Sequence, residues 1–318
     1  MKRELDFIVI GAAKSATTSL YELLKSHPEI HIPKAKEVPF FSDDAMFARG
    51  VQYYFRSYFQ HADRNALWGT VTPQYMLDND TVSVEKIADR IYNTFPKTKI
   101  IALLRNPAER AYSHYKMQVQ RGHESRSFIS IVQDTLHDPV AMRKSEMPDE
   151  SYIFASEYGR ILEAYYSLFP KENILVITTD ELQDQPVQSI RRICSFIGAD
   201  TTYAPPHPLK RHREGGSKPR FKFLTPGFLY SIPFVEKIWK TKTNPVLRKK
   251  IEYAINLWNT RKDKSQLHKD GKAYHKLMNF FKDDTETVER LTNKKMPWSL
   301  NNETDEPQAM QTIKEATQ

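Results

Sequence analysis

Short apolar segments that alternate with helical patterns constrain the fold of this chain more than any other feature. Residues 6–11, 99–104 and 173–178 are rich in Ile, Val and Leu and show no regular polar alternation. Strands of this kind occur in parallel sheets, because helices cover both faces of such sheets. Apolar residues at helical spacing mark helices before His27, over 84–95 and over 187–197. The sequence therefore predicts an α/β fold, a single domain with a central parallel β-sheet flanked by helices.

Further helices are expected outside this alternation. One should begin at Pro107, because proline suits the first position of a helix, and continue to Gln120. An aromatic-rich helix is expected over 151–168. Beyond Ala204 the chain becomes rich in proline and charge, and helices are then expected around 245–262 and 272–293. We place one domain over residues 1–300, with a helical C-terminal part, followed by a polar tail over 301–318.

The composition favours a folded protein without a disulfide or a membrane span. A 318-residue chain with 40% hydrophobic residues can bury a sizeable core. Its single cysteine, Cys194, cannot form an internal disulfide and lies at helical spacing with isoleucines, so we expect it in the core. No segment approaches the ~20 apolar residues that a membrane span needs. The first residues do not resemble a signal peptide, and a cytoplasmic location without a membrane partner is the expectation.

The net charge of +8 comes from one segment of the chain. Residues 207–250 contain twelve Lys and Arg residues against Glu214 and Glu236, whereas the rest of the chain is close to neutral. Aromatic residues are interleaved with these charges, as in some nucleic-acid-binding surfaces. An acidic ligand or partner, or plain solvation, would explain the segment equally well.

A first candidate site lies at residues 11–19 (Gly-Ala-Ala-Lys-Ser-Ala-Thr-Thr-Ser), between an apolar strand and a helix. Unpaired N–H groups and the helix dipole attract an anion there, and Lys14 and the hydroxyl groups add charge and donors. The segment is not a nucleotide-hydrolase P-loop, because Ala13 precedes the lysine where that motif has glycine. The alternative is an ordinary turn whose helix is capped by Ser15 or Thr17.

A second candidate anion site follows the strand over 99–104. On a helix that begins at Pro107, Arg110 shares a face with Ser113 or His114. Arg105 at the end of the strand, together with a hydroxyl group on this helix, could hold a phosphate by forked hydrogen bonds. The alternative is a surface arginine paired with Glu109. A magnesium-dependent kinase would more naturally have an aspartate after this strand.

The two motifs together resemble those of the phosphoadenosine phosphosulfate (PAPS)-dependent sulfotransferases. The likeness includes residues 14–20, His27-Pro28, residues 36–41 (Lys-Glu-Val-Pro-Phe-Phe) and residues 105–115, and it runs from about Phe7 to Trp298. It is greatest toward the bacterial members and the heparan sulfate type. The resemblance implies a P-loop-like strand-turn-helix that binds the phosphosulfate, PAPS as cofactor, PAP as product and no required metal.

The resemblance also implies which residues bind the cofactor. The first loop would bind the 5′-phosphosulfate, and Arg105 and Ser113 would hold the 3′-phosphate. Tyr158 lies where the family often contacts the adenine side. A later basic loop with two adjacent glycines would close as a lid, within a segment over 205–262 that also carries acceptor-pocket elements. The cofactor residues so implied are Lys14, Ser15, Ala16, Thr17, Thr18, Ser19, Arg105, Ser113, Tyr158, Ser217, Lys218 and Arg220.

Lys14 and Glu37 are the expected catalytic residues. Lys14 would stabilise charge on the leaving phosphate. Glu37 matches the catalytic glutamate of the heparan-type enzymes and would accept the proton of the acceptor hydroxyl. The alternative for Glu37 is a salt bridge with Lys34 or Lys36. Rival bases are the histidines His31, His61, His114, His123, His207 and His212.

One departure from the family pattern concerns the acceptor. Thr70 and Val71 precede Thr72-Pro73, where the family usually has Glu or Glu-Lys, which puts a polysaccharide handled in the usual way in doubt. The aromatic cluster over 53–59 is too dense for one helix face, so part of it could line a pocket, whereas core packing is the expected role of most of it. The expected acceptor-pocket residues are Phe41, Tyr53, Tyr54, Thr72, Tyr75 and His114.

The sequence therefore predicts a PAPS-dependent sulfotransferase that acts on a hydroxyl group of a small soluble acceptor, in the tailoring of a natural product. Transfer to an amine or guanidine nitrogen stays open, and an oligosaccharide or a glycolipid is the alternative acceptor. Nucleic-acid binding ranks lower, because it would leave the two anion sites without a role. A nucleotide kinase also ranks lower, because the sequence lacks the glycine before Lys14 and an aspartate after the strand over 99–104. The oligomeric state is open, with a homodimer as one option.

Overall fold

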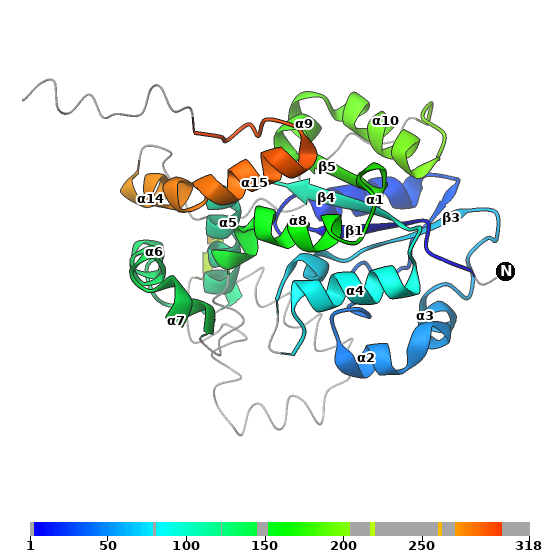
Figure 1. Ribbon diagram of the computed structural model, residues 1–318, viewed down its shortest axis with the longest axis horizontal. Coiled ribbons are helices and arrows are strands. Elements are labelled where there is room, and N and C mark those ends of the chain that lie inside the picture. The colour runs from blue at the N-terminus through cyan, green and yellow to red at the C-terminus, as the bar shows by residue number, and fades with distance from the viewer. Residues whose placement is uncertain are drawn as a thin grey trace, which may run out of the picture.

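A five-stranded parallel sheet forms the centre of the molecule, as predicted (Figure 1). The computed structural model describes residues 3–78, 81–121, 123–144, 152–203, 217–219, 260–262 and 271–300. The strand order is β2-β3-β1-β4-β5. The strands are β1 (Phe7–Gly11), β2 (Ile30–His31), β3 (Leu67–Val71), β4 (Lys99–Leu104) and β5 (Ile174–Thr178).

The alternation of side chains along β1 explains why both faces of the sheet are covered. Phe7 and Val9 lie in one apolar cluster, whereas Ile8 and Ile10 lie in another, and all four are fully buried. Strand residues alternate between faces, so a continuous apolar run needs a helix layer on each side. The absence of polar alternation in these strands is therefore a direct consequence of the two-sided packing.

Helices α1 (Thr17–Ser26), α9 (Thr179–Asp184) and α10 (Pro186–Ile197) cover the first face (Figure 1). Leu20, Leu23 and Leu24 of α1 are buried there, as their spacing predicted. Cys194 on α10 is also buried, which confirms its predicted place in the core, and burial raises the pKa of its thiol.

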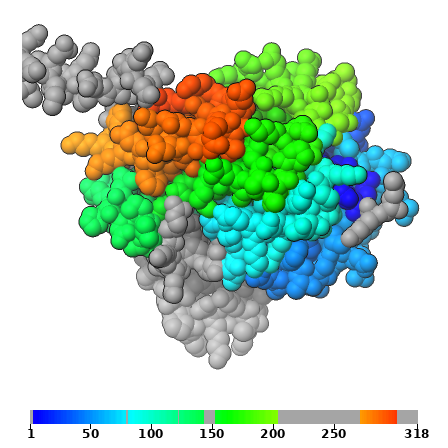
Figure 2. Space-filling model, viewed as in Figure 1, coloured from blue at the N-terminus to red at the C-terminus, as the bar shows by residue number. Residues whose placement is uncertain are grey.

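Helices α4 (Val84–Thr94), α5 (Pro107–Arg121) and α8 (Tyr158–Tyr166) cover the second face. Helix α15 (Lys282–Thr292) packs along α8, so the C-terminal part joins this layer (Figure 2). Asn106 caps α5, because its side-chain oxygen accepts a hydrogen bond of 3.1 Å from the Glu109 N–H. Pro107 then occupies the first helical position, as expected.

The predicted helix over 151–168 is partly wrong. Residues 154–156 form a 3₁₀ turn, η3 (Phe154–Ser156), and the α-helix begins only at Tyr158. The reason is tertiary: the Arg110 guanidinium donates to the Tyr152 carbonyl and, at 2.6 Å, to the Ser156 hydroxyl. Contacts with a distant side chain therefore replace a regular helical turn here.

The predicted helix over 272–293 is divided into α14 (Lys272–Phe280) and α15, with the fully buried Phe281 at the junction. Residues 260–262 form strand β7 (Thr260–Lys262), so the end of the helix predicted around 245–262 is wrong, and the rest of it lies outside the described residues. The predicted tail over 301–318 also lies outside them. No described helix is both long and apolar enough to cross a membrane.

Several elements have no counterpart in the predictions. Most of them have too few residues to show a clear period, whereas α6 does bury Phe128, Ile131 and Val132 at helical spacing and was missed. The unpredicted elements are β2, β3, α2 (Asp44–Ala48), α3 (Gly50–Tyr58), η1 (Pro73–Met76), α6 (Phe128–His137), α7 (Pro139–Lys144), η4 (Lys171–Asn173), α9 and the strand β6 (Ser217–Pro219), which pairs antiparallel with β7.

Gly69 on β3 allows the Phe7 ring to lie flat against the neighbouring strand. The two residues are partners in the β1–β3 register, and a Cβ atom on Gly69 would lie 2.1 Å from the Phe7 ring. We expect Gly69→Ala to lower the free energy of unfolding by about 3 kcal/mol, at the upper end of the usual cost of overpacking. Urea unfolding measures this. The double variant Gly69→Ala/Phe7→Leu should recover part of the loss, and an unchanged midpoint in the single variant would contradict this packing.

Candidate active site

The carboxyl ends of three adjacent strands carry most of the predicted site residues. β1 lies between β3 and β4 and all three strands are parallel, so the turns that follow them lie together at the carboxyl end of the sheet. The Lys14 loop follows β1, Arg105 follows β4, and Thr72 follows β3. In open α/β sheets, ligands bind outside the carboxyl ends of strands that lie side by side in this way. Neighbouring strands are about 4.8 Å apart, so the three turns lie within reach of one small ligand.

The loop between β1 and α1 is held in an unusual backbone conformation. Lys14 and Ala16 have φ values of 73° and 62°, in the left-handed region that residues other than glycine rarely adopt. Ala16 is the N-cap of α1 and makes no side-chain capping hydrogen bond, so the predicted alternative of a cap by Ser15 or Thr17 is wrong. The N-cap residue therefore supplies no side-chain acceptor to the first turn of α1, and N–H groups at a helix start can bind an anion.

Two buried hydroxyl groups lie beside this loop. Ser15 is fully buried, Tyr158 is 1% exposed, and neither hydroxyl makes a hydrogen bond of good geometry among the described residues, although they lie near each other. Burial raises the pKa of the Tyr158 hydroxyl, and the positive charge of Arg110 acts against that rise. Buried hydroxyl groups normally have partners. Both could bind polar groups of a ligand, and the structure places Tyr158 next to Ser15 of the Lys14 loop.

Arg110 is a fully buried cation beneath the loop, and it was not among the predicted cofactor residues. Its described hydrogen bonds go to neutral acceptors: the Ser156 hydroxyl, the Tyr152 carbonyl and, at 3.4 Å, the Ala13 carbonyl. Burial lowers the pKa of its guanidinium to about 10, with a smaller contribution from Arg105. A buried charge without a counter-charge is costly, so this region favours a bound anion.

His114 lies in the same positive region. It is 9% exposed, and its Nδ1 has no described hydrogen-bond partner. Burial lowers the pKa of its imidazole to about 2, and Arg110 and Lys14 contribute to this. His114 is therefore neutral at physiological pH. The Lys14 ammonium lies 3.7 Å from the Met117 sulfur on the same helix, so Lys14 leans toward α5.

Arg105 and Ser113 occupy the second predicted anion site. The Arg105 guanidinium donates to a Glu109 oxygen at 2.8 and 3.2 Å, so the local pair that was the alternative is present. The Arg105 side chain is 33% exposed, and it retains further donors for a ligand. Ser113 is half-buried two turns along α5 from the strand end. Arg105, at the end of β4, and Ser113, on α5, therefore lie at the carboxyl end of the sheet, beside the Lys14 loop.

Glu37 lies at the end of β3, on the other side of the Lys14 loop from Arg105. The Lys36 ammonium donates to its Oε1 at 2.8 Å, which confirms one of the two predicted salt bridges. The Gln74 amide donates to its Oε2, also at 2.8 Å. The next residue, Val38, is clamped to β3, because its N–H donates to the Thr72 hydroxyl at 3.2 Å and its carbonyl accepts from Tyr75 at 2.6 Å. The backbone of Glu37 is therefore fixed relative to the sheet edge.

The residues predicted for the acceptor pocket separate into two groups. Phe41, Tyr54, Thr72 and Tyr75 are fully buried, and the structure packs them in the interior behind the Glu37 segment. The Tyr53 ring stacks under the Arg49 guanidinium on the other side of α3. Of the rest of the cluster, Phe55 and Phe59 pack on Trp68 near the start of β3, toward the amino ends of the strands, and Tyr58 packs on Tyr54. His114 is the pocket candidate that lies beside Lys14.

The predicted lid lies mostly outside the described residues. Of its cofactor residues, Ser217 and Lys218 are described only in their backbone, and Arg220 lies outside. Strand β6, which contains Ser217 and Lys218, packs against α5, the helix of Ser113. The basic stretch over 237–250 lies outside the described residues.

Asp284 connects the C-terminal helices to the site. Its two carboxylate oxygens accept from the N–H groups of Gly159 at 2.9 Å and Arg160 at 3.0 Å, so it caps α8 directly after Tyr158. A Cβ atom on Gly159 would lie 2.5 Å from the Asp284 carbonyl, which explains the glycine at this position. A carboxylate is favourable at a helix N-terminus. Asp284 therefore positions the helix turn that carries Tyr158.

The titration of Asp284 gives a prediction for stability. Burial raises its pKa from 3.8 to about 6. The folded protein therefore binds this proton when the unfolded chain has already lost it, and the free energy of unfolding should fall as the pH rises from about 4 to about 6. We expect Asp284→Asn to remove this fall, as measured by urea unfolding across that range. The exposed Asp283→Asn is the control, and parallel profiles for wild type and Asp284→Asn would refute the assignment.

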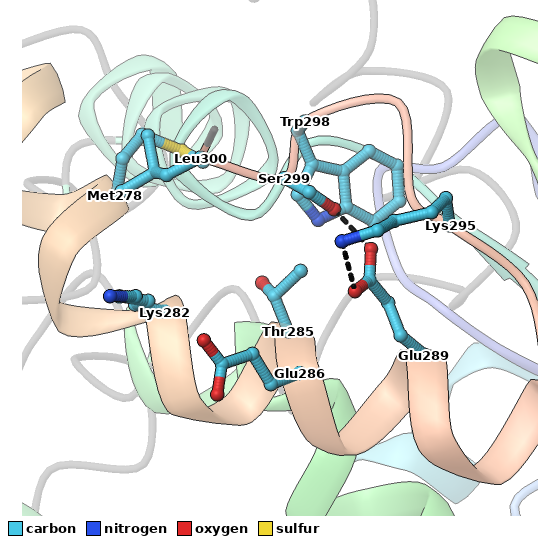
Figure 3. Close-up of a pocket in the computed structure, with 9 residues that line it drawn as sticks. All are labelled: Met278, Lys282, Thr285, Glu286, Glu289, Lys295, Trp298, Ser299 and Leu300. Atoms are coloured by element: carbon cyan, nitrogen blue, oxygen red, sulfur yellow. Dashed lines mark hydrogen bonds and ion pairs between the residues drawn. The ribbon is translucent and has the colours of Figure 1, made fainter. Parts of the chain in front are cut away.

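A small pocket lies between α15 and the segment that follows it (Figure 3). Its lining includes Met278, Lys282, Glu286, Trp298 and Leu300. The Trp298 indole N–H has no hydrogen-bond partner among the described residues. None of the predicted cofactor residues lines this pocket. Within the described part of the chain, no group of three or more His, Cys, Asp or Glu side chains is placed to hold a metal ion.

Comparison with known proteins relates this site to one family. The sulfotransferase domain profile matches residues 4–218, about two thirds of the chain. The chain is 35% identical over 117 residues to membrane-associated sulfotransferase kil1 of Dictyostelium discoideum, with 36% of this chain and 23% of that protein covered. It is 26% identical over 191 residues to heparan sulfate glucosamine 3-O-sulfotransferase 5 of Mus musculus, with 60% of this chain and 52% of that protein covered. The chain thus matches about half or less of the length of these relatives.

A solved structure shares the fold. The sulfotransferase from Alicyclobacillus acidocaldarius superposes with a TM-score of 0.61 at 24% identity, and the match covers 93% of this chain and 99% of that one. At 24% identity, this similarity supports only a shared fold. It agrees with the parallel sheet and flanking helices described above.

Proposed function

The chain belongs to the sulfotransferase domain family, and from this premise we propose that it transfers the sulfuryl group of PAPS to a hydroxyl group of a small acceptor. The order of three strand ends carries the proposal: Glu37 beside β3, the Lys14 loop after β1, and Arg105 after β4. A cofactor with two separate anionic groups can span β1 and β4. The acceptor would then approach from the side of β3, where Glu37 lies.

The residues present fit PAPS. Lys14 and the N–H groups at the start of α1 would hold the phosphosulfate, and Arg105 and Ser113 would hold the 3′-phosphate. The Ser15 and Tyr158 hydroxyls, which have no hydrogen-bond partner of good geometry among the described residues, and the buried Arg110 charge favour an anionic, hydrogen-bonding ligand. When bound, PAPS supplies an activated sulfuryl group on a phosphate leaving group.

The chain's own residues supply charge, alignment and a base. Lys14 stabilises the negative charge that develops on the leaving phosphate, in a site where buried surroundings strengthen the effect. Glu37 accepts the proton of the acceptor hydroxyl. The rigid loop and the clamp on Val38 hold donor and base in fixed relation, which lowers the entropic part of the barrier.

We propose a small soluble alcohol, such as an intermediate of a natural product, as the acceptor. Thr70 and Val71 stand where the family usually has Glu or Glu-Lys, and both are fully buried, so neither side chain is exposed to contact a polysaccharide. An oligosaccharide is the second candidate, which the names of the heparan sulfate relatives favour.

Binding of PAP tests the cofactor site without any acceptor. We expect PAP to bind at least tenfold more tightly than adenosine 5′-phosphate, because a charge-assisted contact with the 3′-phosphate is lost in the latter. Arg105→Ala should remove most of that difference in isothermal titration calorimetry. The exposed Arg64→Ala is the control. Equal affinities of the wild type for the two nucleotides would contradict the assignment of Arg105 and Ser113.

Transfer of ³⁵S from labelled PAPS tests the activity. The acceptor panel should contain alcohols, amines and heparan-derived oligosaccharides, so that it separates the two acceptor classes. Label in a small alcohol supports the first proposal, and label only in an oligosaccharide supports the second. Phosphate transfer from adenosine triphosphate with magnesium, in place of sulfuryl transfer, would refute both.

A further inference from the structure

Gln74 lies between the predicted base and the cofactor loop. It belongs to η1, directly after β3, and the backbone on both sides of it is held: the Thr72 N–H donates to the Val9 carbonyl at 2.9 Å, and the Tyr165 hydroxyl donates to the Tyr75 carbonyl at 2.6 Å. Met76 of the same turn packs on Gly11, where the Lys14 loop begins. The Gln74 side chain therefore starts from a rigid part of the site.

The amide of Gln74 is oriented by Glu37. Its Nε2 donates to the Glu37 Oε2 at 2.8 Å, and Lys36 donates to the other oxygen, also at 2.8 Å. A carboxylate only accepts hydrogen bonds, so the opposite orientation of the amide would place two oxygens against each other. The Glu37 side chain is 45% exposed, and donors on both oxygens restrict the rotamers that it would otherwise sample.

The other end of the amide has no partner. The Gln74 Oε1 is buried and accepts no hydrogen bond from the described residues. A buried acceptor without a donor lowers stability, and an apolar side chain of the same size would avoid that loss. The stability of the fold therefore does not explain a glutamine at this position, whereas the donor to Glu37 does.

We propose that Gln74 is the positioning residue of Glu37, holding its carboxylate at the end of β3, on the side of the Lys14 loop. This inference rests on the proposed function of Glu37 as the base. Gln74 acts through Glu37 and does not itself take the acceptor's proton. The second donor, Lys36, comes from the same segment as Glu37, so of these two donors it is Gln74 that connects the carboxylate to the sheet.

Titration of Glu37 by carboxyl ¹³C NMR tests the coupling without acceptor or cofactor. The Glu37 signal is identified by its loss in Glu37→Gln. In Gln74→Met the carboxylate loses a donor, so the midpoint should move up by roughly half to one pH unit. Gln74→Glu should move it further, because a second carboxylate then faces the first. The exposed Gln52→Met is the matched control, and an unchanged midpoint in Gln74→Met would overturn the proposal.

Stability separates positioning from a structural role. Because Gln74→Met removes the unpartnered oxygen, its urea midpoint should equal or exceed that of the wild type. A lower midpoint together with an unchanged Glu37 titration would mean that Gln74 only supports the fold, and the proposal would then fail.

Turnover of ³⁵S-labelled PAPS with glycerol as surrogate acceptor separates this inference from the proposed function. Gln74→Met should lower kcat roughly 10- to 100-fold with little change in KM for PAPS, and it should add no loss in a Glu37→Gln background. If Glu37→Gln keeps wild-type turnover, the base assignment fails while the NMR coupling still stands. If Glu37→Gln loses turnover and Gln74→Met behaves as wild type in both measurements, only the positioning role fails.

Discussion

Replacement of Lys14 by alanine is expected to lower the rate of sulfuryl transfer from PAPS by about 10²- to 10³-fold, the usual loss when a group that stabilises transition-state charge is removed. Lys14 lies half-buried in the loop between β1 and α1, at the edge where the leaving phosphate would develop its charge. PAP binding should weaken as well, because under the proposed function the same ammonium would contact the product phosphate. Initial rates with ³⁵S-labelled PAPS and calorimetry with PAP measure the two effects.

Two variants serve as controls for Lys14. Lys171→Ala removes an exposed lysine just before β5, at the amino end of the strands and so away from the site. It should leave rate and affinity unchanged. Lys14→Arg keeps the charge but changes its geometry, so its loss should be smaller than that of alanine. The thermal midpoint of Lys14→Ala should match that of the wild type. A rate within about twofold of wild type in a folded Lys14→Ala protein would exclude Lys14 from the reaction.

Replacement of Glu37 by glutamine is expected to lower kcat by about 10²- to 10⁴-fold, the range for a general base. Affinity for PAP should change little, because Glu37 lies beside β3 and the cofactor residues follow β1 and β4. The acid limb of the wild-type pH–rate profile should disappear in the variant, since the group that must lose its proton is gone. Rates across the pH range, measured with the acceptor that the labelled panel identifies, give both results.

Glu37→Asp and Glu22→Gln are the controls for Glu37. Aspartate keeps the carboxylate but withdraws it by one methylene group, so an intermediate loss with a retained acid limb is expected. Glu22 is an exposed carboxylate on α1, and its replacement should have no effect. If Glu37→Gln keeps both the wild-type rate and the acid limb, another group acts as the base. His114 would not fill that role easily, because burial among cations lowers the pKa of its imidazole to about 2.

Together the two variants separate the roles that the strand order suggests. Loss of Lys14 should impair both PAP binding and turnover, whereas loss of Glu37 should impair turnover alone. A thousandfold loss in rate corresponds to about 4 kcal/mol. That is a large part of the stability of a typical domain, so unfolding must be measured for each variant before its rate is interpreted.

The local pattern of the sequence was sufficient for the principal strands and helices. The runs at β1, β4 and β5 and the apolar faces of α1, α4 and α10 carry their periods within a few consecutive residues. Pro107 marks the start of α5 for the same reason, since its fixed φ acts on its own position. Such features depend on the residue and its near neighbours, so a single sequence contains them in full.

Patterns that depend on distant partners were misinterpreted. The aromatic residues over 152–156 suggest a helix, but Arg110 on α5 takes the acceptors that a helical turn would use. In the aromatic cluster over 53–59, core packing was expected for most residues and is confirmed for Phe55, which packs on Trp68, but the placing of Tyr54 in the acceptor pocket is wrong because Tyr54 is fully buried. The partners, Arg110 and Trp68, lie outside these segments, so the spacing of residues within each segment does not predict the contact.

The sequence by itself determined the parallel α/β fold and the positions of Lys14 and Arg105 in the turns that follow two of its strands, because strand ends and the short motifs after them are local features. The choice of Glu37 came from the resemblance to the sulfotransferases. Only the tertiary structure decided that the ends of β3, β1 and β4 lie side by side, that Arg110 is a buried cation beneath the loop, and that Gln74 holds Glu37. Strand order and side-chain contacts arise from the packing of segments that are distant in the chain. The excess of positive charge over 207–250 is known from the sequence only, because the structure does not describe the side chains of these residues.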